Sequence, residues 1–356
     1  MLNKLKLYNN KKVFITGNSG FKGAWLSVFL EELGADVIGY SDKIKWKKSV
    51  FDYNTINSIN QYWGDIRDYK SLEKSMLDTN PDFVFHLAAQ PLVIDSYENP
   101  FDTFTTNING TLNLLDIMYK KFSSVPLIIV TSDKVYDNCN NKIKKFSEIS
   151  SLKGNCPYSV SKVICEFLSS SYFGISKNMI VRTVRGGNVL GGGDWSKNRI
   201  IPDLVKSLIN QSTPIIRNPN HTRPWSYILD TILGYLLVGL DTINSKKSFD
   251  SFNIGSFDNE NRTVFEVTNL FLKTFDTKDI KIVNNNKYTE KKFLNLDTTK
   301  ARNDLSWSSM VKFEELIFQT ANWYKRVLKN ESPYFVTKDL IKNYCNLIHK
   351  RDKVYA

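Results

Sequence analysis

Two short patterns hold side chains that could do acid–base chemistry. Tyr158 and Lys162 stand four residues apart, so on a helix both side chains project from one face. A nearby ammonium favours the phenolate, which lets such a tyrosine act as a base toward a sugar hydroxyl. The tripeptide Ser132-Asp133-Lys134 places a hydroxyl, a carboxyl and an amine in consecutive positions. Simpler alternatives remain open, namely a surface Tyr-x-x-x-Lys pair and an Asp-capped turn with an exposed lysine.

A glycine-rich loop near the start of the chain could hold a dinucleotide. The run Gly17-Asn18-Ser19-Gly20-Phe21-Lys22-Gly23 follows a short apolar stretch and opens a segment with helical spacing. Glycines let the backbone approach a pyrophosphate, and a helix N-terminus offers unpaired N–H groups and a positive dipole. This setting favours dinucleotide binding over a purely structural turn.

Residues further along the chain are expected to complete the cofactor site. Asp42 could bind the ribose hydroxyls of NAD, although Lys43 follows it and could instead meet the 2′-phosphate of NADP. We expect NAD. Asp65 and Ile66 could hold the adenine edge, but Asp65 suits a turn equally well. The other residues that we expect to contact the cofactor are Ala88, Ala89, Gln90, Asn107 and Thr131, together with Tyr158 and Lys162.

The elements that must position these residues alternate between strands and helices. Strands are predicted at 13–16, 36–40, 83–87, 126–131 and 179–183, and helices at 22–33, 104–121 and 158–170. Near-continuous apolar strands separated by helices predict an α/β fold, a Rossmann-like, doubly wound parallel sheet covered on both faces. The tripeptide at 132–134 then lies at the carboxyl end of a strand, where ligands bind in such folds.

The pattern loosens beyond about residue 185. Three glycines at 191–193 and four prolines between 202 and 224 suggest loops, and helices recur near 200–210, 228–240, 263–275 and 313–329. We predict two domains. Residues 1–185 would bind NAD, and residues 186–356 would mainly bind the substrate, with some segments returning to the first domain.

Composition and charge narrow the class of protein. The chain has 356 residues, of which 42% are apolar and 24% charged, so it falls in the globular range. Its net charge of +12 suits nucleic acid or an anionic small molecule, and the lack of a recognised nucleic-acid module favours the small molecule. No apolar run approaches the roughly 18 residues of a membrane span, and the polar N-terminus does not resemble a secretory signal.

The cysteines and histidines indicate neither a metal site nor a disulfide framework. Cys139, Cys156, Cys165 and Cys345 lack the spacing of either, so a reduced cytoplasmic setting is expected. His86 ends an apolar strand, and we interpret it as a core or cofactor-lining residue rather than a general base.

Longer strings of sequence carry a family resemblance. The residues at 16–23, 86–90 and 158–162 resemble the extended short-chain dehydrogenase/reductase family. Within that family the chain is most similar to the CDP-glucose 4,6-dehydratases. That likeness rests on GFKGAWL (20–26), TSDKVYDN (131–138), GNVLGGGDW (187–195), RNP (217–219), RPW (223–225) and LDTTKAR (296–302).

The resemblance implies an internal redox cycle on a nucleotide sugar. Tyr158, aided by Lys162 and Ser132, would take the O4 proton while hydride leaves C4 for NAD. Lys134 would remove the C5 proton, Asp133 would protonate the departing C6 hydroxyl, and hydride would return to C6. The 4-keto-6-deoxy product would supply deoxysugars for a surface polysaccharide. Most related dehydratases use a glutamate as this base, whereas Lys134 matches the CDP-glucose group.

The resemblance also assigns the nucleotide diphosphate to the second half of the chain. Asn188, Trp195, Arg199 and Arg223 are the expected substrate contacts. Arginine is favoured because its planar fork pairs bidentately with phosphate. A structural salt bridge is the alternative for each arginine, and Trp195 could stack on the base or close the core. A homodimer or homotetramer is expected.

Two departures from the family pattern leave alternatives open. Ile94-Asp95 stands where related enzymes generally carry a basic residue, and the loop at 41–62 is rich in lysine. Another nucleotide, or a heptose in place of glucose, would fit nearly as well. A nucleotide-sugar epimerase or oxidoreductase is the first alternative function, and a non-catalytic dinucleotide-binding regulator that contacts RNA is the second.

Overall fold

A parallel sheet forms the centre of the chain in the computed structural model. The structure describes residues 1–138, 145–176, 178–216, 218–244, 249–256, 261–277, 281–282 and 294–354. Within them, the largest sheet has the strand order β11-β7-β5-β4-β1-β2-β3, and all its neighbouring strands are parallel. Its strands are β1 (Lys12–Thr16), β2 (Asp36–Ser41), β3 (Asn60–Trp63), β4 (Phe83–His86), β5 (Leu127–Val130), β7 (Val181–Gly186) and β11 (Phe249–Ile254). The predicted Rossmann-like fold class is confirmed.

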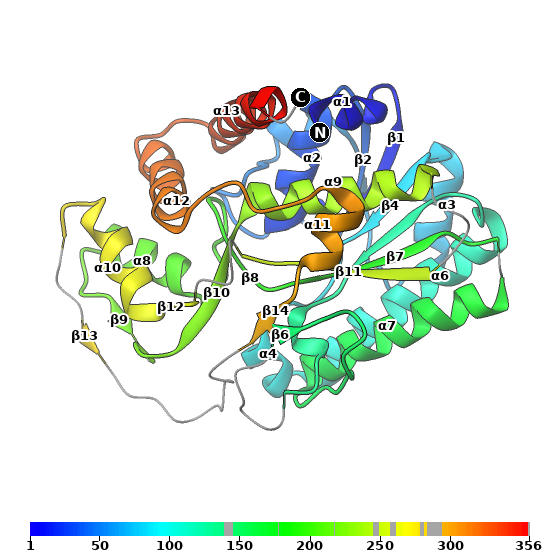
Figure 1. Cartoon of the computed structure of the whole chain (residues 1–356), viewed down its shortest axis with the longest axis horizontal. Coiled ribbons are helices and arrows are strands. Elements are labelled where there is room, and N and C mark those ends of the chain that lie inside the picture. Colours follow the sequence, from blue (N-terminus) through cyan, green and yellow to red (C-terminus); the bar gives the residue numbers. More distant parts are fainter. Residues whose placement is uncertain are drawn as a thin grey trace.

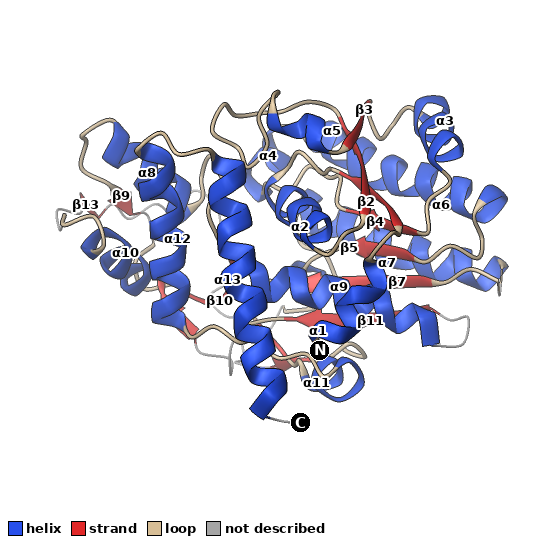
Figure 2. Ribbon diagram, turned by 90° about the horizontal axis from the view of Figure 1, so that it is seen from above, coloured by secondary structure: helices blue, strands red, loops and turns tan. Residues whose placement is uncertain are grey.

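Alternate side chains of each central strand enter two separate cores. Val13 and Ile15 pack on one face of the sheet, and Phe14 between them packs on the other. Helices α2 (Phe21–Glu32) and α9 (Ile228–Asn244) contribute to the first core, whereas α6 (Gly110–Lys121) and α3 (Tyr69–Thr79) contribute to the second. Figure 2 shows helices on both sides of the red strands. Burial on both faces explains why these strands are continuously apolar.

Helix α2 is the element that fixes the glycine-rich loop. Residues 23–30 of α2 are all buried, because the helix packs against β1, α9 and the C-terminal helix α13 (Pro333–Val354). Lys338 of α13 pairs with Glu32 at the end of α2, with 2.7 Å between Nζ and Oε1. The loop therefore enters a helix that cannot shift without disturbing the core.

The second half of the chain forms a smaller body beside the sheet. Strand β10 (Thr222–Tyr227) pairs in parallel with β8 (Asn188–Leu190) and antiparallel with β12 (Asn261–Thr263). Helices α8 (Ile200–Ile209), α10 (Val264–Lys273) and α12 (Phe313–Leu328) surround this sheet, on the left in Figure 1. Strand β11 and helices α9 and α11 (Thr299–Leu305) pack with the large sheet. The domain boundary at residue 185 stays a prediction.

The remaining elements are the long helix α7 and several short segments. They are α1 (Leu2–Leu5), η1 (Lys6–Tyr8), η2 (Thr55–Ser58), α4 (Val93–Glu98), α5 (Pro100–Phe104), η3 (Thr105–Asn109), η4 (Asp133–Val135), α7 (Pro157–Ile175), and the strand pairs β6 (Lys145–Phe146) with β14 (Asn295–Leu296) and β9 (Ile215–Ile216) with β13 (Lys281–Ile282). The helix predicted at 104–121 is split, because η3 is a π-helical turn between α5 and α6.

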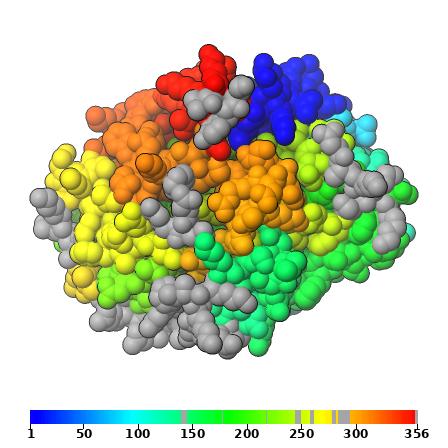
Figure 3. Space-filling view, viewed as in Figure 1, coloured from blue at the N-terminus to red at the C-terminus, as the bar shows by residue number. Residues whose placement is uncertain are grey.

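The two ends of the described chain lie side by side. The amino group of Met1 is 2.9 Å from the carboxylate of Asp352, and Figure 3 shows the blue N-terminal segment meeting the red C-terminal helix. Of the helices that the structure describes, none combines the length and the apolar character needed to cross a membrane.

Candidate active site

A cavity of about 940 Å³ lies at the carboxyl edge of the large sheet. Its lining comes from the glycine-rich loop, from the segments that follow β2, β3, β4 and β5, and from residues 186–225 of the second half. This volume is at the upper end of the range for small-molecule sites, as expected for a cavity that holds two ligands. The segments that follow the parallel strands therefore meet residues of the second half of the chain at one site.

The glycine-rich loop is packed so closely that two of its three glycines, Gly17 and Gly23, have no room for a side chain. A Cβ on Gly23 would lie 2.2 Å from the carbonyl oxygen of Gly17, and one on Gly17 would lie 2.6 Å from the backbone nitrogen of Ala88. Gly17 also has a φ of 75°. Helix α2 begins at Phe21, directly after Gly20, so its N–H groups and dipole face the cavity edge. This cradle fits the pyrophosphate of a dinucleotide.

Two predicted cofactor residues support the cavity from behind. Asn18 is fully buried, and its side chain accepts a hydrogen bond from Ser41 Oγ (2.7 Å) and donates one to Gln61 Oε1 (2.6 Å). Asn107 accepts a hydrogen bond from the backbone N–H of Gln90 at 2.8 Å and is also buried. Neither side chain lines the cavity, so the structure places both as supports of the loops that do.

The other predicted cofactor residues line the cavity. They are Gly17, Ser19, Gly20, Phe21, Lys22, Gly23, Asp42, Asp65, Ile66, Ala88, Ala89, Gln90, Thr131, Tyr158 and Lys162. Asp65 is also held by Arg67, with 2.6 Å between Oδ2 and Nη2, and these hydrogen bonds lower the pKa of Asp65. Asp65 therefore combines the two interpretations of the sequence, since it belongs to a fixed turn and borders the cavity.

His86 belongs to the core. Its Nδ1 is 2.7 Å from Thr16 Oγ1 and its Nε2 is 3.0 Å from Thr111 Oγ1. Burial lowers its pKa to about 3, so the imidazole is neutral at physiological pH. His86 is absent from the lining and connects β1 to α6 beneath it.

The tripeptide 132–134 forms a capped turn at the end of β5. Ser132 Oγ accepts a hydrogen bond from the backbone N–H of Lys134 at 3.2 Å and donates one to Asp133 Oδ1 at 3.1 Å. Asp133 Oδ1 is 3.9 Å from Lys134 Nζ. Asp133 is buried, and the side chain of Lys134 is one-quarter exposed. All three residues line the cavity, and the cap of the turn is Ser132 rather than the aspartate.

Helix α7 brings Tyr158 and Lys162 to the same cavity. The helix starts there because Cys156 caps it and Pro157 occupies its first turn. Both Tyr158 and Lys162 are buried and line the cavity one helical turn apart. Lys162 Nζ donates a hydrogen bond to the carbonyl oxygen of Val130 at 3.1 Å, next to the turn. The two patterns found in the sequence therefore meet in one cavity.

Positive charge collects around Lys22. Burial, followed by the nearby charge of Arg199, lowers the pKa of Lys22 to about 8, and Lys162 and Lys134 act on it in the same direction. Asp133 opposes them. Such a cluster attracts an anionic ligand, which is consistent with a net charge of +12.

The expected substrate residues line the opposite wall. Asn188, Trp195, Arg199 and Arg223 all border the cavity. Arg199 also makes an ion pair with Asp194 (3.4 Å), so its salt-bridge alternative is present as well. Trp195 donates a hydrogen bond to the carbonyl oxygen of Lys48 at 2.7 Å and packs edge-on against Tyr324. Its indole therefore closes the core while one part of it borders the cavity.

Sequence reasoning missed other lining residues. Asp95 and Tyr97 project from α4, and Lys197 on the opposite wall lies 3.8 Å from Asp95. Both α4 residues follow the 86–90 string, and Lys197 follows GGGDW, so continuing those strings by one turn would have found them. His221 and Trp225 also line the cavity.

No metal cluster was found in the part of the chain that the structure describes. Cys156, Cys165 and Cys345 are free thiols there, and Cys139 lies outside the described residues. Arg217, in the RNP string, lies outside them too.

Comparison with known proteins gives a consistent result. The family model described as GDP-mannose 4,6 dehydratase matches residues 14–320. CDP-glucose 4,6-dehydratase of Salmonella typhimurium is 36% identical over 349 residues, which cover 95% of this chain and 97% of the relative. CDP-paratose 2-epimerase of Salmonella typhi is 25% identical, over 88% of this chain and 98% of the relative.

Solved structures share the fold. An epimerase from Methanothermobacter thermautotrophicus superposes with a TM-score of 0.81 at 24% identity, over 92% of this chain and 96% of that one. The dTDP-glucose 4,6-dehydratase of Streptomyces venezuelae, solved with NAD bound, gives a TM-score of 0.76 at 22% identity, over 91% and 99%.

Proposed function

The chain belongs to the GDP-mannose 4,6 dehydratase family, and from this membership we propose that it is an NAD-dependent nucleotide-sugar 4,6-dehydratase whose substrate is CDP-glucose. One observation carries the proposal. The turn that holds Asp133 and Lys134 opens into the same cavity as Tyr158 and Lys162. An epimerase that acts at C4 needs only the second pair, whereas removal of water across C5 and C6 also needs an acid and a base.

Each catalytic side chain handles one proton. NAD, when bound, supplies the hydride acceptor for C4 and the hydride that ends on C6. Tyr158 Oη takes the O4 proton, with Lys162 one helical turn away on α7 and the Ser132 hydroxyl on the same cavity to assist it. Lys134 Nζ then takes the C5 proton, and the Asp133 carboxyl protonates the C6 oxygen, which leaves as water.

The proton balance closes within the site, where Lys134 Nζ and Asp133 Oδ1 lie 3.9 Å apart. Elimination moves the C5 proton to Lys134 and takes one proton from Asp133. Return of hydride to C6 makes an enolate, which takes its proton at C5 back from Lys134 Nζ. The O4 proton held by Tyr158 replaces the one that Asp133 gave to the departing water, so each group returns to its starting state.

The two walls of the cavity divide the ligands between them. The N–H groups at residues 17–23 bind the pyrophosphate of NAD, Asp42 binds its ribose, and Asp65 and Ile66 border its adenine. A carboxylate at residue 42 repels a 2′-phosphate, which favours NAD over NADP. Arg199 and Arg223 bind the nucleotide diphosphate of the substrate, with Asn188 and Trp195 beside them.

Isotope transfer tests the reaction. CDP-glucose with deuterium at C4 is incubated with the protein and NAD, and the products are analysed by mass spectrometry. We expect a product that has lost one water and carries the deuterium at C6. Altered stereochemistry without loss of water would instead support the epimerase. If CDP-glucose stays unchanged, the same assay with dTDP-glucose and with CDP-heptoses decides whether the nucleotide or the sugar was wrongly assigned.

We also propose that two copies associate through helices α6 and α7, which pack side by side. Their outer face, with the preceding helix α5, carries exposed apolar side chains, among them Phe101 (80% exposed), Phe167 (58%) and Leu112. A Phe167→Glu variant should elute as a monomer in size-exclusion chromatography with light scattering, whereas the parent protein should have twice that mass. A parent protein of monomer mass would contradict the proposal. The cytoplasmic setting and the supply of deoxysugars for a surface polysaccharide stay predictions.

A further inference from the structure

A buried ion pair lies directly behind the catalytic turn. Glu166 follows Lys162 by one turn of α7, and Arg185 lies on β7. Their contact is bidentate, with 2.8 Å between Nη2 and Oε2 and 3.1 Å between Nε and Oε1. Both residues are buried and neither lines the cavity. Taking two such charges out of water is unfavourable, so a core is more easily filled with apolar side chains.

This pair contacts both ends of the turn that carries the acid and the base. At the front end, Thr131 Oγ1 donates a hydrogen bond to Glu166 Oε1 at 2.5 Å. At the rear end, Arg185 Nη1 donates one to the hydroxyl of Tyr136 at 3.0 Å. The residues between these contacts include Ser132, Asp133 and Lys134. The catalytic turn therefore spans two points that are fixed to one ion pair.

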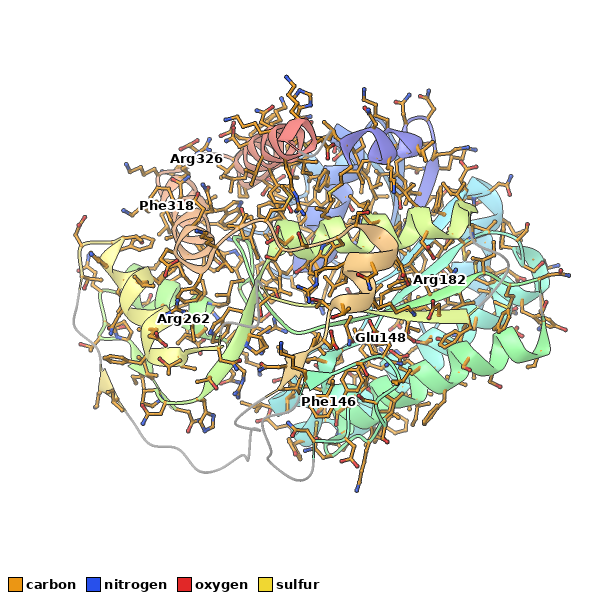
Figure 4. All side chains as sticks on the ribbon, in the orientation of Figure 1. Phe146, Glu148, Arg182, Arg262, Phe318 and Arg326 are labelled. Atoms are coloured by element: carbon orange, nitrogen blue, oxygen red, sulfur yellow. The ribbon has the colours of Figure 1, made fainter. Side chains whose placement is uncertain are left out.

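The pair itself is held on every side. Thr183 donates a hydrogen bond to Glu166 Oε2 at 2.8 Å, and Arg185 donates one to the backbone oxygen of Glu148 at 2.9 Å. Tyr136 in turn donates to Asn253 Oδ1 at 2.6 Å and stacks on Phe146. Figure 4 labels Phe146 and Glu148 below β11, at the foot of this network. A network whose polar groups are satisfied in this way holds its members rigidly.

We propose that Glu166 and Arg185 are positioning residues that set the catalytic turn in register with Tyr158 and Lys162. This inference rests on the proposed dehydratase function. Lys162 and Glu166 lie on one face of α7 and contact adjacent residues at the end of β5, since Lys162 binds the carbonyl oxygen of Val130, the last residue of the strand, and Glu166 binds Thr131, which follows it. Helix α7 thus carries Tyr158, the base for the O4 proton, and through Glu166 it also positions the turn that holds Lys134, the base for the C5 proton.

An ion pair between a buried arginine of the same strand and a partly exposed aspartate of α9 provides a control. Arg182 lies three residues before Arg185 on β7 and is equally buried, and its Nε is 3.1 Å from Asp241 Oδ2. Neither residue lines the cavity. In Figure 4 Arg182 lies to the right of Glu148, among the strands of the large sheet. Breaking this pair should lower the free energy of unfolding without altering the turn.

The test separates the two chemical stages. Two stages are measured in the variants Glu166→Gln, Tyr136→Phe and Asp241→Asn. Oxidation at C4 is followed by the absorbance of reduced nicotinamide after rapid mixing. Elimination is followed by the release of water and by exchange of the C5 proton with deuterated solvent. We expect Glu166→Gln to slow elimination about 100-fold, the usual effect of a displacement near 1 Å, with little change in KM or in oxidation. Tyr136→Phe, which leaves the ion pair intact, should slow the same stage by a smaller factor.

Thermal unfolding of the same variants distinguishes positioning from general stability. Asp241→Asn should lower Tm and keep the parent ratio of elimination to oxidation. If Glu166→Gln and Tyr136→Phe also keep that ratio, the positioning role is wrong, whatever their Tm. If Glu166→Gln does not fold, the ratio in Tyr136→Phe decides alone. A parent protein that releases no water from CDP-glucose or from the other nucleotide sugars overturns the proposed function itself, and the positioning role with it.

Discussion

The two walls of the cavity are built in different ways. The wall made by residues 17–23 consists of backbone, packed to the point where a Cβ on Gly23 would meet a carbonyl oxygen at 2.2 Å. The opposite wall consists of side chains, including Arg199 and Arg223, that reach the cavity from separate segments. Backbone packing fails abruptly when one atom is added, whereas a wall of separate side chains loses affinity in steps. We therefore expect substitutions of the tightly packed glycines in the first wall to act as all-or-none changes.

The sharpest way to break this contrast is to add one methyl group to the glycine-rich loop. Gly23→Ala should abolish detectable NAD binding and lower the free energy of unfolding by about 1–3 kcal/mol, because the new Cβ overlaps the backbone of Gly17 and Asn18. Isothermal titration with NAD and urea unfolding measure the two effects.

Another glycine gives the control. At Gly174, near the end of α7, no described atom comes within 4 Å of an added Cβ, so Gly174→Ala should bind NAD normally. It should also be more stable by up to about 1 kcal/mol, since alanine favours the helix. Normal NAD binding in Gly23→Ala would show that the loop yields and that the two walls do not differ in this way.

The turn between the walls should respond next most strongly. Lys134→Ala removes the amine that takes the C5 proton, and loss of a general base costs about 10²–10⁴-fold in rate. Oxidation at C4 should continue, because Tyr158 and Lys162 are held by α7 and by the carbonyl oxygen of Val130. Mass spectrometry of single turnovers follows both stages. Elimination at the parent rate would remove Lys134 from the mechanism.

The sequence predicted the first wall more completely than the second. The glycine-rich loop and the Tyr158–Lys162 spacing are contiguous patterns, and each lies where a predicted strand or helix puts it. Strand β10, which contains Pro224, pairs with β8 some 35 residues earlier, and no local period records such a pairing. Helix α13 was also missed, although Val336, Leu340, Tyr344 and Ile348 form a buried stripe with helical spacing.

Residue type alone did not give the direction of a side chain. Asn18 and Asn107 belong to strings typical of cofactor sites, yet the amide of Asn18 binds strands β2 and β3 and that of Asn107 binds the backbone of Gln90. A motif identifies the residue type at a position in the loop. Whether that side chain contacts a ligand or makes a buried hydrogen bond depends on the rest of the fold. The Glu166–Arg185 pair was missed for the same reason, since the residues that it joins come from α7, from β7 and from the segment after β5.

A graded change on the second wall would sharpen the contrast. Arg223→Lys keeps the positive charge but loses the planar fork, so one of two hydrogen bonds to the diphosphate is lost. A charge-assisted hydrogen bond contributes about 1.5–3 kcal/mol, which predicts an increase in KM of about tenfold or more with a much smaller change in kcat. Initial rates over a range of CDP-glucose concentrations measure both constants. An equal fall in kcat would mean that Arg223 acts on the reacting atoms.

The smallest expected effect concerns a charge inside the first wall. Burial, with Arg199 second, lowers the pKa of Lys22 to about 8, whereas an unfolded lysine has a pKa of about 10.4. Between these two values the unfolded chain binds a proton that the folded chain has released, so the free energy of unfolding should rise with pH. Because Lys22 is only half-buried as a residue, solvent screens part of this effect.

Lys22→Met tests the sign of that dependence. Its free energy of unfolding should exceed that of the parent at neutral pH, where the parent holds a poorly solvated ammonium, and the difference should shrink at about pH 9 as the parent loses that proton. Lys45→Met, an exposed lysine on the same cavity, should follow the parent at both pH values. Urea unfolding without nucleotide gives these values. If the excess stability of Lys22→Met over the parent grows with pH, the folded protein stabilises the Lys22 ammonium instead of disfavouring it. Lys22 would then be a stabilised positive charge inside the wall that is otherwise built from backbone.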